Sequence, residues 1–213
     1  MKLTDGTTAA FRVVHLDNLQ VYLRRGMLHA ASSSPSDGLD WRPTHAAEIQ
    51  TRRASASVPV GPGGVLLDYV PFHLGPRNLF LYNLNTRRVP GYAEGQEPLV
   101  TLVVAMEDLL AAGHRLVFYD GHALNALSAC FDSPAALAGF DWEAIDGRDF
   151  SNADPDRKRR KQAELLVHQS APWSLVRGIA VCNDVARTRT LRVMSSYPTS
   201  LHKPVRVTPN WYF

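Results

Sequence analysis

The fold class is decided by the stretch Leu99-Val-Thr-Leu-Val-Val-Ala-Met-Glu-Asp-Leu-Leu-Ala-Ala-Gly-His-Arg-Leu-Val-Phe-Tyr119. Its apolar beginning predicts a buried strand over Leu99–Ala105. A short helix is predicted over Glu107–Ala112, stopped by Gly113, and a second strand over Arg115–Tyr119. Short strands and short helices also mix elsewhere in the chain without regular β-α alternation, which predicts an α+β fold.

The remaining elements follow from the same patterns of apolar residues, caps and breakers. Residues 163–167 fit either the end of a helix that begins near Arg157 or a strand. Loops are predicted at Ala31–Asp40, Ser57–Gly64 and Phe150–Asp156. Further strands are predicted at Phe11–His15, Val65–Val70, Gly178–Cys182, Thr190–Met194 and Val205–Val207, and helices at Asn18–Arg25, at Ala46–Arg53 and after Asp120-Gly-His-Ala123 to about Phe131.

Length and composition indicate one globular domain over residues 1–213. The chain is 45% hydrophobic and 20% charged and has no internal repeat or long linker. Its start lacks the apolar core of a signal peptide, and its apolar runs are too short to span a bilayer. Cys130 and Cys182 lie far apart, which argues against a disulfide framework or a cysteine-based zinc site. We therefore expect a cytoplasmic protein without a metal or a membrane anchor.

The charge distribution points weakly to a polyanionic partner. There are 23 Lys and Arg residues against 20 Asp and Glu residues, a small excess. The basic residues cluster at Arg24-Arg25, Arg52-Arg53, Arg87-Arg88 and Arg157–Lys161. Each cluster alone is typical of a solvated surface, whereas four in one small chain favour nucleic acid.

Motifs that commonly mark nucleotide or hydrolase sites are missing. The sequence has no G-x-G-x-x-G after a strand, no G-x-x-x-x-G-K-[ST], no H-E-x-x-H and no G-x-S-x-G. A dinucleotide, if bound, is therefore not bound through a Rossmann fingerprint.

Four polar residues in apolar settings are the candidate site. Glu164 is a carboxylate within an apolar segment, and burying it without compensation is costly. It is either a salt-bridge partner of Arg159, Arg160 or Lys161, or an acid that stabilises positive charge at a glycosidic carbon. His15 and Asn18 flank a strand-to-helix junction, and His122 follows a strand end, where ligands often bind. The alternatives for these three are a core histidine, a helix cap and a turn histidine.

The order and spacing of several segments carry a family resemblance. They are His15-Leu-Asp-Asn-Leu19, Arg52-Arg53 ahead of Val58-Pro-Val-Gly-Pro-Gly-Gly64, Leu67-Asp-Tyr-Val-Pro-Phe72, Gly75-Pro-Arg77, Val89-Pro-Gly-Tyr92, Phe118-Tyr-Asp-Gly-His-Ala123, Arg157-Lys-Arg-Arg-Lys-Gln-Ala-Glu-Leu-Leu-Val167 and Pro209-Asn-Trp-Tyr-Phe213. Together they resemble the DarT family of DNA ADP-ribosyltransferase toxins almost end to end.

The resemblance implies a fold like the poly-ADP-ribose polymerase catalytic domain, with mixed sheets around an NAD cleft. It implies that Glu164 is the catalytic glutamate and that Arg53 assists the target base, with Arg52 as its nearest competitor. Binding of the co-substrate NAD is assigned by the same resemblance to His15, Asn18, Arg52, His73, Phe80 and His122.

One segment departs from the family pattern. Relatives commonly read Val-Pro-Phe-Tyr-Phe-x-Pro-Arg-Ser-Pro-Met-Leu-Tyr, where this chain has Val70-Pro-Phe-His-Leu-Gly-Pro-Arg-Asn-Leu-Phe-Leu-Tyr82. His73 thus replaces an aromatic residue expected beside nicotinamide, and Phe80 replaces a methionine while keeping the capacity to stack on a ring.

The implied activity is NAD-dependent ADP-ribosylation of a base in single-stranded DNA. Thymine is the expected base, because the overall pattern is closer to the thymine branch of the family. The implied partner is a macrodomain antitoxin that reverses the modification. Alternatives are guanine as the target, RNA or protein as the acceptor, and a non-catalytic nucleic-acid-binding module.

Overall fold

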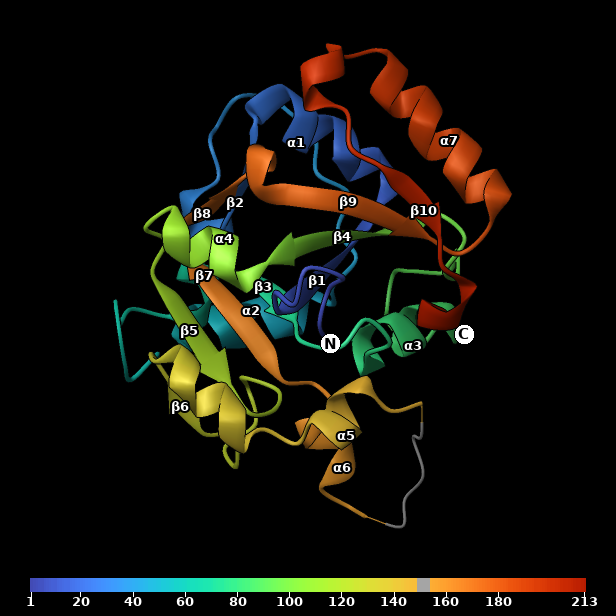
Figure 1. The fold of residues 1–213 in the computed structure, drawn as a ribbon. Coiled ribbons are helices and arrows are strands. Elements are labelled where there is room, and N and C mark those ends of the chain that lie inside the picture. Colours follow the sequence, from blue (N-terminus) through green and yellow to red (C-terminus); the bar gives the residue numbers. More distant parts are fainter. Residues whose placement is uncertain (149–153) are drawn as a thin grey trace.

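The computed structural model describes residues 1–148 and 154–213 and contains one large mixed sheet (Figure 1). It has eight strands in the order β10-β9-β4-β1-β3-β7-β5-β6. All neighbours are antiparallel except β9 and β10. The strands are β1 (Ala9–His15), β3 (Tyr69–His73), β4 (Leu99–Ala105), β5 (Leu116–Tyr119), β6 (Cys130–Phe131), β7 (Glu164–His168), β9 (Val176–Val181) and β10 (Val205–Val207); β2 (Met27–His29) and β8 (Ser170–Pro172) pair separately.

Short helices cover this sheet. Figure 1 shows α1 and α7 together at one end of the molecule and α5 and α6 at the other. None of the helices within residues 1–148 and 154–213 is long and apolar enough to cross a membrane. The helices are α1 (Leu19–Arg25), α2 (Ala47–Ser55), α3 (Leu79–Asn85), α4 (Met106–Ala111), α5 (Trp142–Asp146), α6 (Arg157–Arg160) and α7 (Asp184–Ser195).

The predicted strand Leu99–Ala105 is confirmed and forms the centre of the core. Every residue of β4 is buried, so the strand is covered on both faces, which explains its continuous apolar run. Its neighbour β1 pairs with it along the whole strand, from Ala9↔Ala105 to His15↔Leu99. These two strands form the rigid base from which the site is built.

The sheet parts between β1 and β3. These strands share the single register pair Phe11↔His73, whereas β3 and β7 pair from Tyr69↔His168 to His73↔Glu164. Across the parting, Arg12 of β1 donates from Nη1 to the Pro71 carbonyl at 2.9 Å; its Nε donates to the hydroxyl of Tyr22 in α1 at 3.3 Å. The expected mixed sheets around a cleft are therefore present as two parts of one sheet.

Two predicted elements are wrong. The strand over Thr190–Met194 is instead part of α7, because Asn183 caps that helix by accepting from Ala186 N at 2.8 Å. Ala186, Thr190 and Met194 then form its buried face at helical spacing.

The predicted helix ending near Phe131 is also absent, and turns lead into β6 instead. Asn125 accepts from Leu127 N at 2.9 Å, and Asp120 accepts from Ala129 N at 2.9 Å. These side chains compete with helical hydrogen bonding and fold the segment back as a loop.

Other boundaries shift. The predicted strand Val65–Val70 begins as a 3-10 turn over Leu66–Asp68, and the strand runs through Pro71 to His73. The ambiguous residues 163–167 are resolved as β7. Most of the predicted loop Phe150–Asp156 lies outside the described residues.

Candidate active site

A cleft of about 700 Å³ opens where β1 and β3 part. Its walls come from β1, β3 and β7, from α2 and α3, and from the segment that precedes α2. Its volume suits a dinucleotide-sized ligand. The predicted site residues that line it are Arg53, His73, Phe80, His122 and Glu164.

Glu164 begins β7 at the inner end of the cleft. In the sheet it lies between His73 of β3 and Tyr119 of β5, which hold its backbone in register. The residue is only 2% exposed. Oε1 accepts from the Ala123 backbone N–H at 3.0 Å, and Oε2 lies 3.7 Å from Arg53 Nη1. The ion-pair partner is thus Arg53, and the expected alternative of Arg159, Arg160 or Lys161 is wrong.

Arg53 lies in the last turn of α2 and is 8% exposed. It donates from Nη2 to the Leu66 carbonyl at 3.0 Å. Burial lowers the pKa of its guanidinium, and the nearby Glu164 opposes that shift. Arg52 points elsewhere, because it is exposed, donates to the Leu124 carbonyl at 3.4 Å and does not line the cleft. Of the two arginines, geometry therefore favours Arg53 as the one that meets a substrate.

Three rings lie nearly parallel beside this ion pair. The His45 and Phe80 centroids are 4.9 Å apart at 26°, and those of His73 and Phe80 are 6.3 Å apart at 27°. Burial lowers the pKa of His73 to about 4 and that of His45 to about 3. Both imidazoles are neutral at pH 7. His73 Nδ1 is buried and has no hydrogen-bond partner in the described part of the chain.

His15 and Asn18 do not line the cleft. Asn18 is 1% exposed, and its amide forms two hydrogen bonds of 2.8 Å with the backbone of Arg42. His15 Nδ1 accepts from Asp17 N at 3.1 Å, and its Nε2 lies 3.5 Å from Glu94. The Arg42 guanidinium also pairs with Asp17 and Glu94.

These contacts anchor the segment before α2. Trp41, Pro43, His45 and Ala46 of that segment line the cleft, whereas Arg42 between them faces the anchor. His15 and Asn18, which were predicted to contact NAD, instead hold the segment that forms one wall of the cleft.

Arg12 and His45 line the cleft but were missed by the sequence reading. Arg12 is a charged residue within the apolar strand β1. A charged residue in an apolar segment is also the signal that identified Glu164 in β7. His45 stands two residues before α2 among polar and small residues, and nothing in its surroundings marks it.

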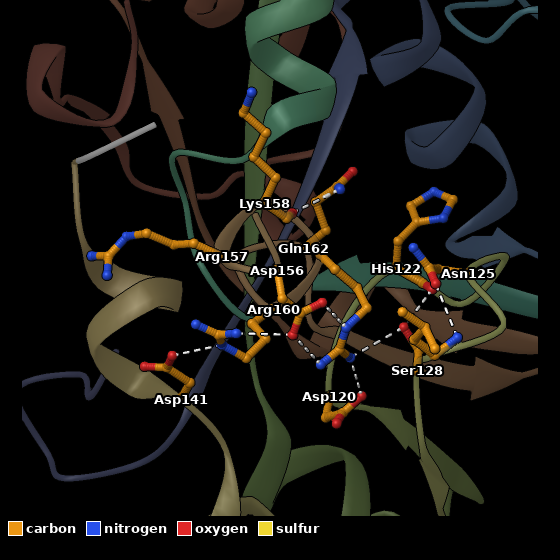
Figure 2. A network of polar contacts seen from close by, with 12 residues as sticks. Asp120, His122, Asn125, Ser128, Asp141, Asp156, Arg157, Lys158, Arg160 and Gln162 are labelled. Atoms are coloured by element: carbon orange, nitrogen blue, oxygen red, sulfur yellow. Dashed lines mark hydrogen bonds and ion pairs between the residues drawn. The ribbon is translucent and has the colours of Figure 1, made fainter. Parts of the chain in front are cut away.

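Three side chains of the basic run 157–161 are paired within the protein, and Figure 2 shows Arg160 between Asp141 and Asp156. Arg159 pairs with Asp120 and Asp156, and Arg160 with Asp141, Asp154 and Asp156. Lys161 is buried and donates to the carbonyls of Ala144 and Gly147. In this arrangement the three side chains of Arg159, Arg160 and Lys161 bind groups of the protein itself, so they do not support the expected contact with nucleic acid.

The site combines a fixed carboxylate, a buried guanidinium and neutral ring surfaces in a concave cleft. This set suits an aromatic ligand with a ribose, because rings stack on Phe80 and a carboxylate accepts from hydroxyl groups. Among residues 1–148 and 154–213, no group of three or more His, Cys, Asp or Glu side chains is placed to hold a metal ion. The residues present fit NAD.

Comparison with known proteins agrees with this chemistry. The family model described as "ssDNA thymidine ADP-ribosyltransferase, DarT" matches residues 11–213. A DNA ADP-ribosyl transferase of Thermus sp. (strain 2.9) is 36% identical over 206 residues, covering 97% of this chain and 96% of the relative.

Solved structures match equally well. Thermus sp. 2.9 DarT in complex with ADP-ribosylated ssDNA superposes with a TM-score of 0.90 at 35% identity, covering 100% of this chain and 99% of that one. The same protein in complex with NAD+ superposes with a TM-score of 0.85 at 33% identity, with 100% of both chains covered. The chain belongs to the DarT family of DNA ADP-ribosyltransferases.

Proposed function

We propose that residues 1–213 form one catalytic domain that cleaves NAD and transfers its ADP-ribose to thymine in single-stranded DNA. The observation that carries this proposal is the buried pair of Glu164 and Arg53 at the end of the cleft. Support also comes from the relative of known structure that holds ADP-ribosylated ssDNA and, in another complex, NAD+.

Glu164 is proposed as the catalytic glutamate. Its Oε1 is fixed by Ala123 N–H, so the carboxylate cannot rotate freely. In this position it accepts from a ribose hydroxyl and stabilises the positive charge that develops at the anomeric carbon as the bond to nicotinamide breaks. The bonding electron pair leaves with nicotinamide.

Arg53 is proposed to assist the acceptor base. A guanidinium is a poor general base, because it stays protonated at neutral pH. Its charge beside the base lowers the free energy of the deprotonated ring nitrogen. Thymine N3 then bonds to the anomeric carbon and its proton passes to solvent.

His73, Phe80 and His122 are proposed to contact NAD directly, since all three line the cleft. His15 and Asn18 act on NAD through the segment they anchor. For Arg52, which is exposed, we propose contact with the DNA strand, in place of the NAD contact implied by the resemblance.

Single-stranded DNA is the proposed acceptor because pairing hides the N3–H of thymine in a duplex. Guanine is the competing target, since His73 and Phe80 depart from the pattern associated with thymine. The proposed biological setting is a toxin that is restrained by a macrodomain antitoxin encoded beside it.

The test uses NAD and four otherwise matched oligonucleotides, each lacking one base, with the product read by mass. We expect an added ADP-ribose on every strand except the one without thymine. Loss of labelling only on the strand without guanine would move the target to guanine and leave the enzyme class intact. Labelling of duplex and single strand at equal rates would contradict the argument from hidden base edges.

A further inference from the structure

The loop 120–129 between β5 and β6 supplies the hydrogen bond that orients Glu164. Ala123 N–H donates to Glu164 Oε1 at 3.0 Å, and the loop also brings His122 to the cleft. Between Asp120 and Ala129 this loop has no helix or strand, and it is held by backbone hydrogen bonds, such as Asp120 N to the Ala129 carbonyl at 3.2 Å, together with side-chain contacts.

Arg159 contacts the loop from outside it through two polar side chains of the loop. Its Nη1 donates to Asp120 Oδ1 at 2.7 Å and approaches Ser128 Oγ at 3.5 Å. Asp120 in turn accepts from Ala129 N at 2.9 Å, and Ser128 Oγ donates to the His122 carbonyl at 2.8 Å (Figure 2). One guanidinium group therefore bonds at both ends of the loop.

The orientation of Arg159 is itself fixed. Its side chain is 11% exposed, and its Nε and Nη2 donate to the two carboxylate oxygens of Asp156 at 2.7 and 2.9 Å. A fork of this kind sets the plane of the guanidinium, leaving Nη1 directed at the loop.

Gly121 shows how closely Arg159 lies against the loop backbone. A Cβ at position 121 would come within 2.7 Å of Arg159 Nη1, 2.8 Å of Arg159 Cγ and 2.8 Å of Ser128 Oγ. Position 121 is therefore glycine because the arginine packs on it, with no positive φ required.

We propose that Arg159 is a positioning residue for Glu164: it holds the loop 120–129 so that Ala123 N–H stays on the catalytic carboxylate. This inference rests on the proposed function of Glu164. It gives Arg159, which belongs to the basic cluster Arg157–Lys161, a structural role in the catalytic apparatus.

The experiment compares Arg159→Gln, Arg159→Lys and Gly121→Ala, with Arg189→Gln as the matched control. Arg189 is an exposed arginine of α7, so its loss removes the same charge far from the loop. The readouts are kcat and KM for NAD in DNA transfer, the salt dependence of single-strand binding, and amide exchange of residues 120–129.

We expect kcat to fall about 10- to 100-fold in all three test variants, because a small displacement of a catalytic group has effects of this order. The salt slope stays within error of the control, and KM for NAD rises by a smaller factor than kcat falls, because the same loop carries His122 to the cleft. Exchange across 120–129 rises, and Arg159→Lys gives no rescue, since lysine lacks the planar fork.

A phosphate contact would give another pattern. Arg159→Gln would then weaken strand binding and reduce the salt slope by about 0.7, while Arg159→Lys would restore both. That pattern, or unchanged exchange of the loop, overturns the inference. A wild-type protein that transfers nothing to DNA would instead contradict the proposed function, and the exchange measurement would still decide whether Arg159 holds the loop.

Discussion

Replacing Glu164 by glutamine separates its chemical role from its structural one. Glutamine keeps the volume and retains an oxygen that accepts from Ala123 N–H, but it removes the charge opposite Arg53. Arg53 is 8% exposed, so its charge is left in a poorly solvated position. The variant should therefore lose both activity and stability.

The size of each loss follows from the geometry. Breaking a buried ion pair from one side costs about 3–5 kcal/mol, and we expect the lower end, about 3 kcal/mol. The reason is that the Nη1–Oε2 distance is 3.7 Å and Arg53 keeps its bond to Leu66. For a chain of this size that corresponds to a melting temperature lower by roughly 6–12 °C. Loss of the charge that stabilises the transition state should lower kcat by about 10²–10³-fold.

Both quantities are measured on one preparation, by thermal unfolding and by transfer per folded molecule. Glu143→Gln is the control, because the Glu143 side chain is 87% exposed and lies outside the cleft. Undiminished transfer per folded molecule in Glu164→Gln would refute the catalytic assignment. An unchanged melting temperature would refute the claim that the pair compensates the burial of Arg53.

Three further outcomes are expected. NAD at 100 times its Kd should stabilise the folded protein by about 2.7 kcal/mol, measured as a rise in melting temperature, and a flat response would count against the NAD cleft. Asn18→Ala should raise KM for NAD more than it lowers kcat, because it releases the wall segment at Arg42; equal binding of NAD by both proteins, measured by calorimetry, would contradict this. The free energy of unfolding should decrease as the pH is lowered from about 6.5 to about 4. Burial lowers the pKa of His73 to about 4 in the folded protein, so in this range His73 takes up a proton in the unfolded chain and stays neutral in the folded one. His73→Gln should reduce that slope by up to about 1.4 kcal/mol per pH unit in urea titrations, and an identical slope would show that His73 titrates normally.

Patterns of burial were predictable from the sequence where one physical effect dominates. The strand at 99–105 is apolar because both of its faces are covered, and Gly26 ends α1 with a φ of 62°. Glu164 stood out because a carboxylate in an apolar segment requires compensation, and its burial agrees with that argument. These are local signals, and they were sufficient for the elements concerned.

Partnerships across the fold were not predictable in this way. The ion-pair partner of Glu164 is Arg53, which lies 111 positions earlier, while the nearer cations of residues 159–161 are bound to other groups. The segment Thr190–Met194 is predicted as a strand, although a cap at Asn183 makes it helical. A tertiary contact decides the partner of Glu164 and leaves no local mark in the sequence, whereas the cap at Asn183 is a local signal that outweighs the strand pattern.

The parting between β1 and β3 has a consequence for how this protein can evolve. Pro71 has no N–H to donate, and proline is usually confined to the edge strands of a sheet, yet Pro71 lies in an interior strand. Its carbonyl accepts from the Arg12 side chain in place of a neighbouring strand. The binding site thus lies where β1 and β3 are not joined by a ladder of hydrogen bonds. The protein lacks the stabilisation that a continuous ladder between these strands would provide. Substitutions that extend the β1–β3 pairing would raise the stability of the protein and narrow the cleft for its substrate. Selection for stability and selection for turnover therefore act in opposite directions between these two strands.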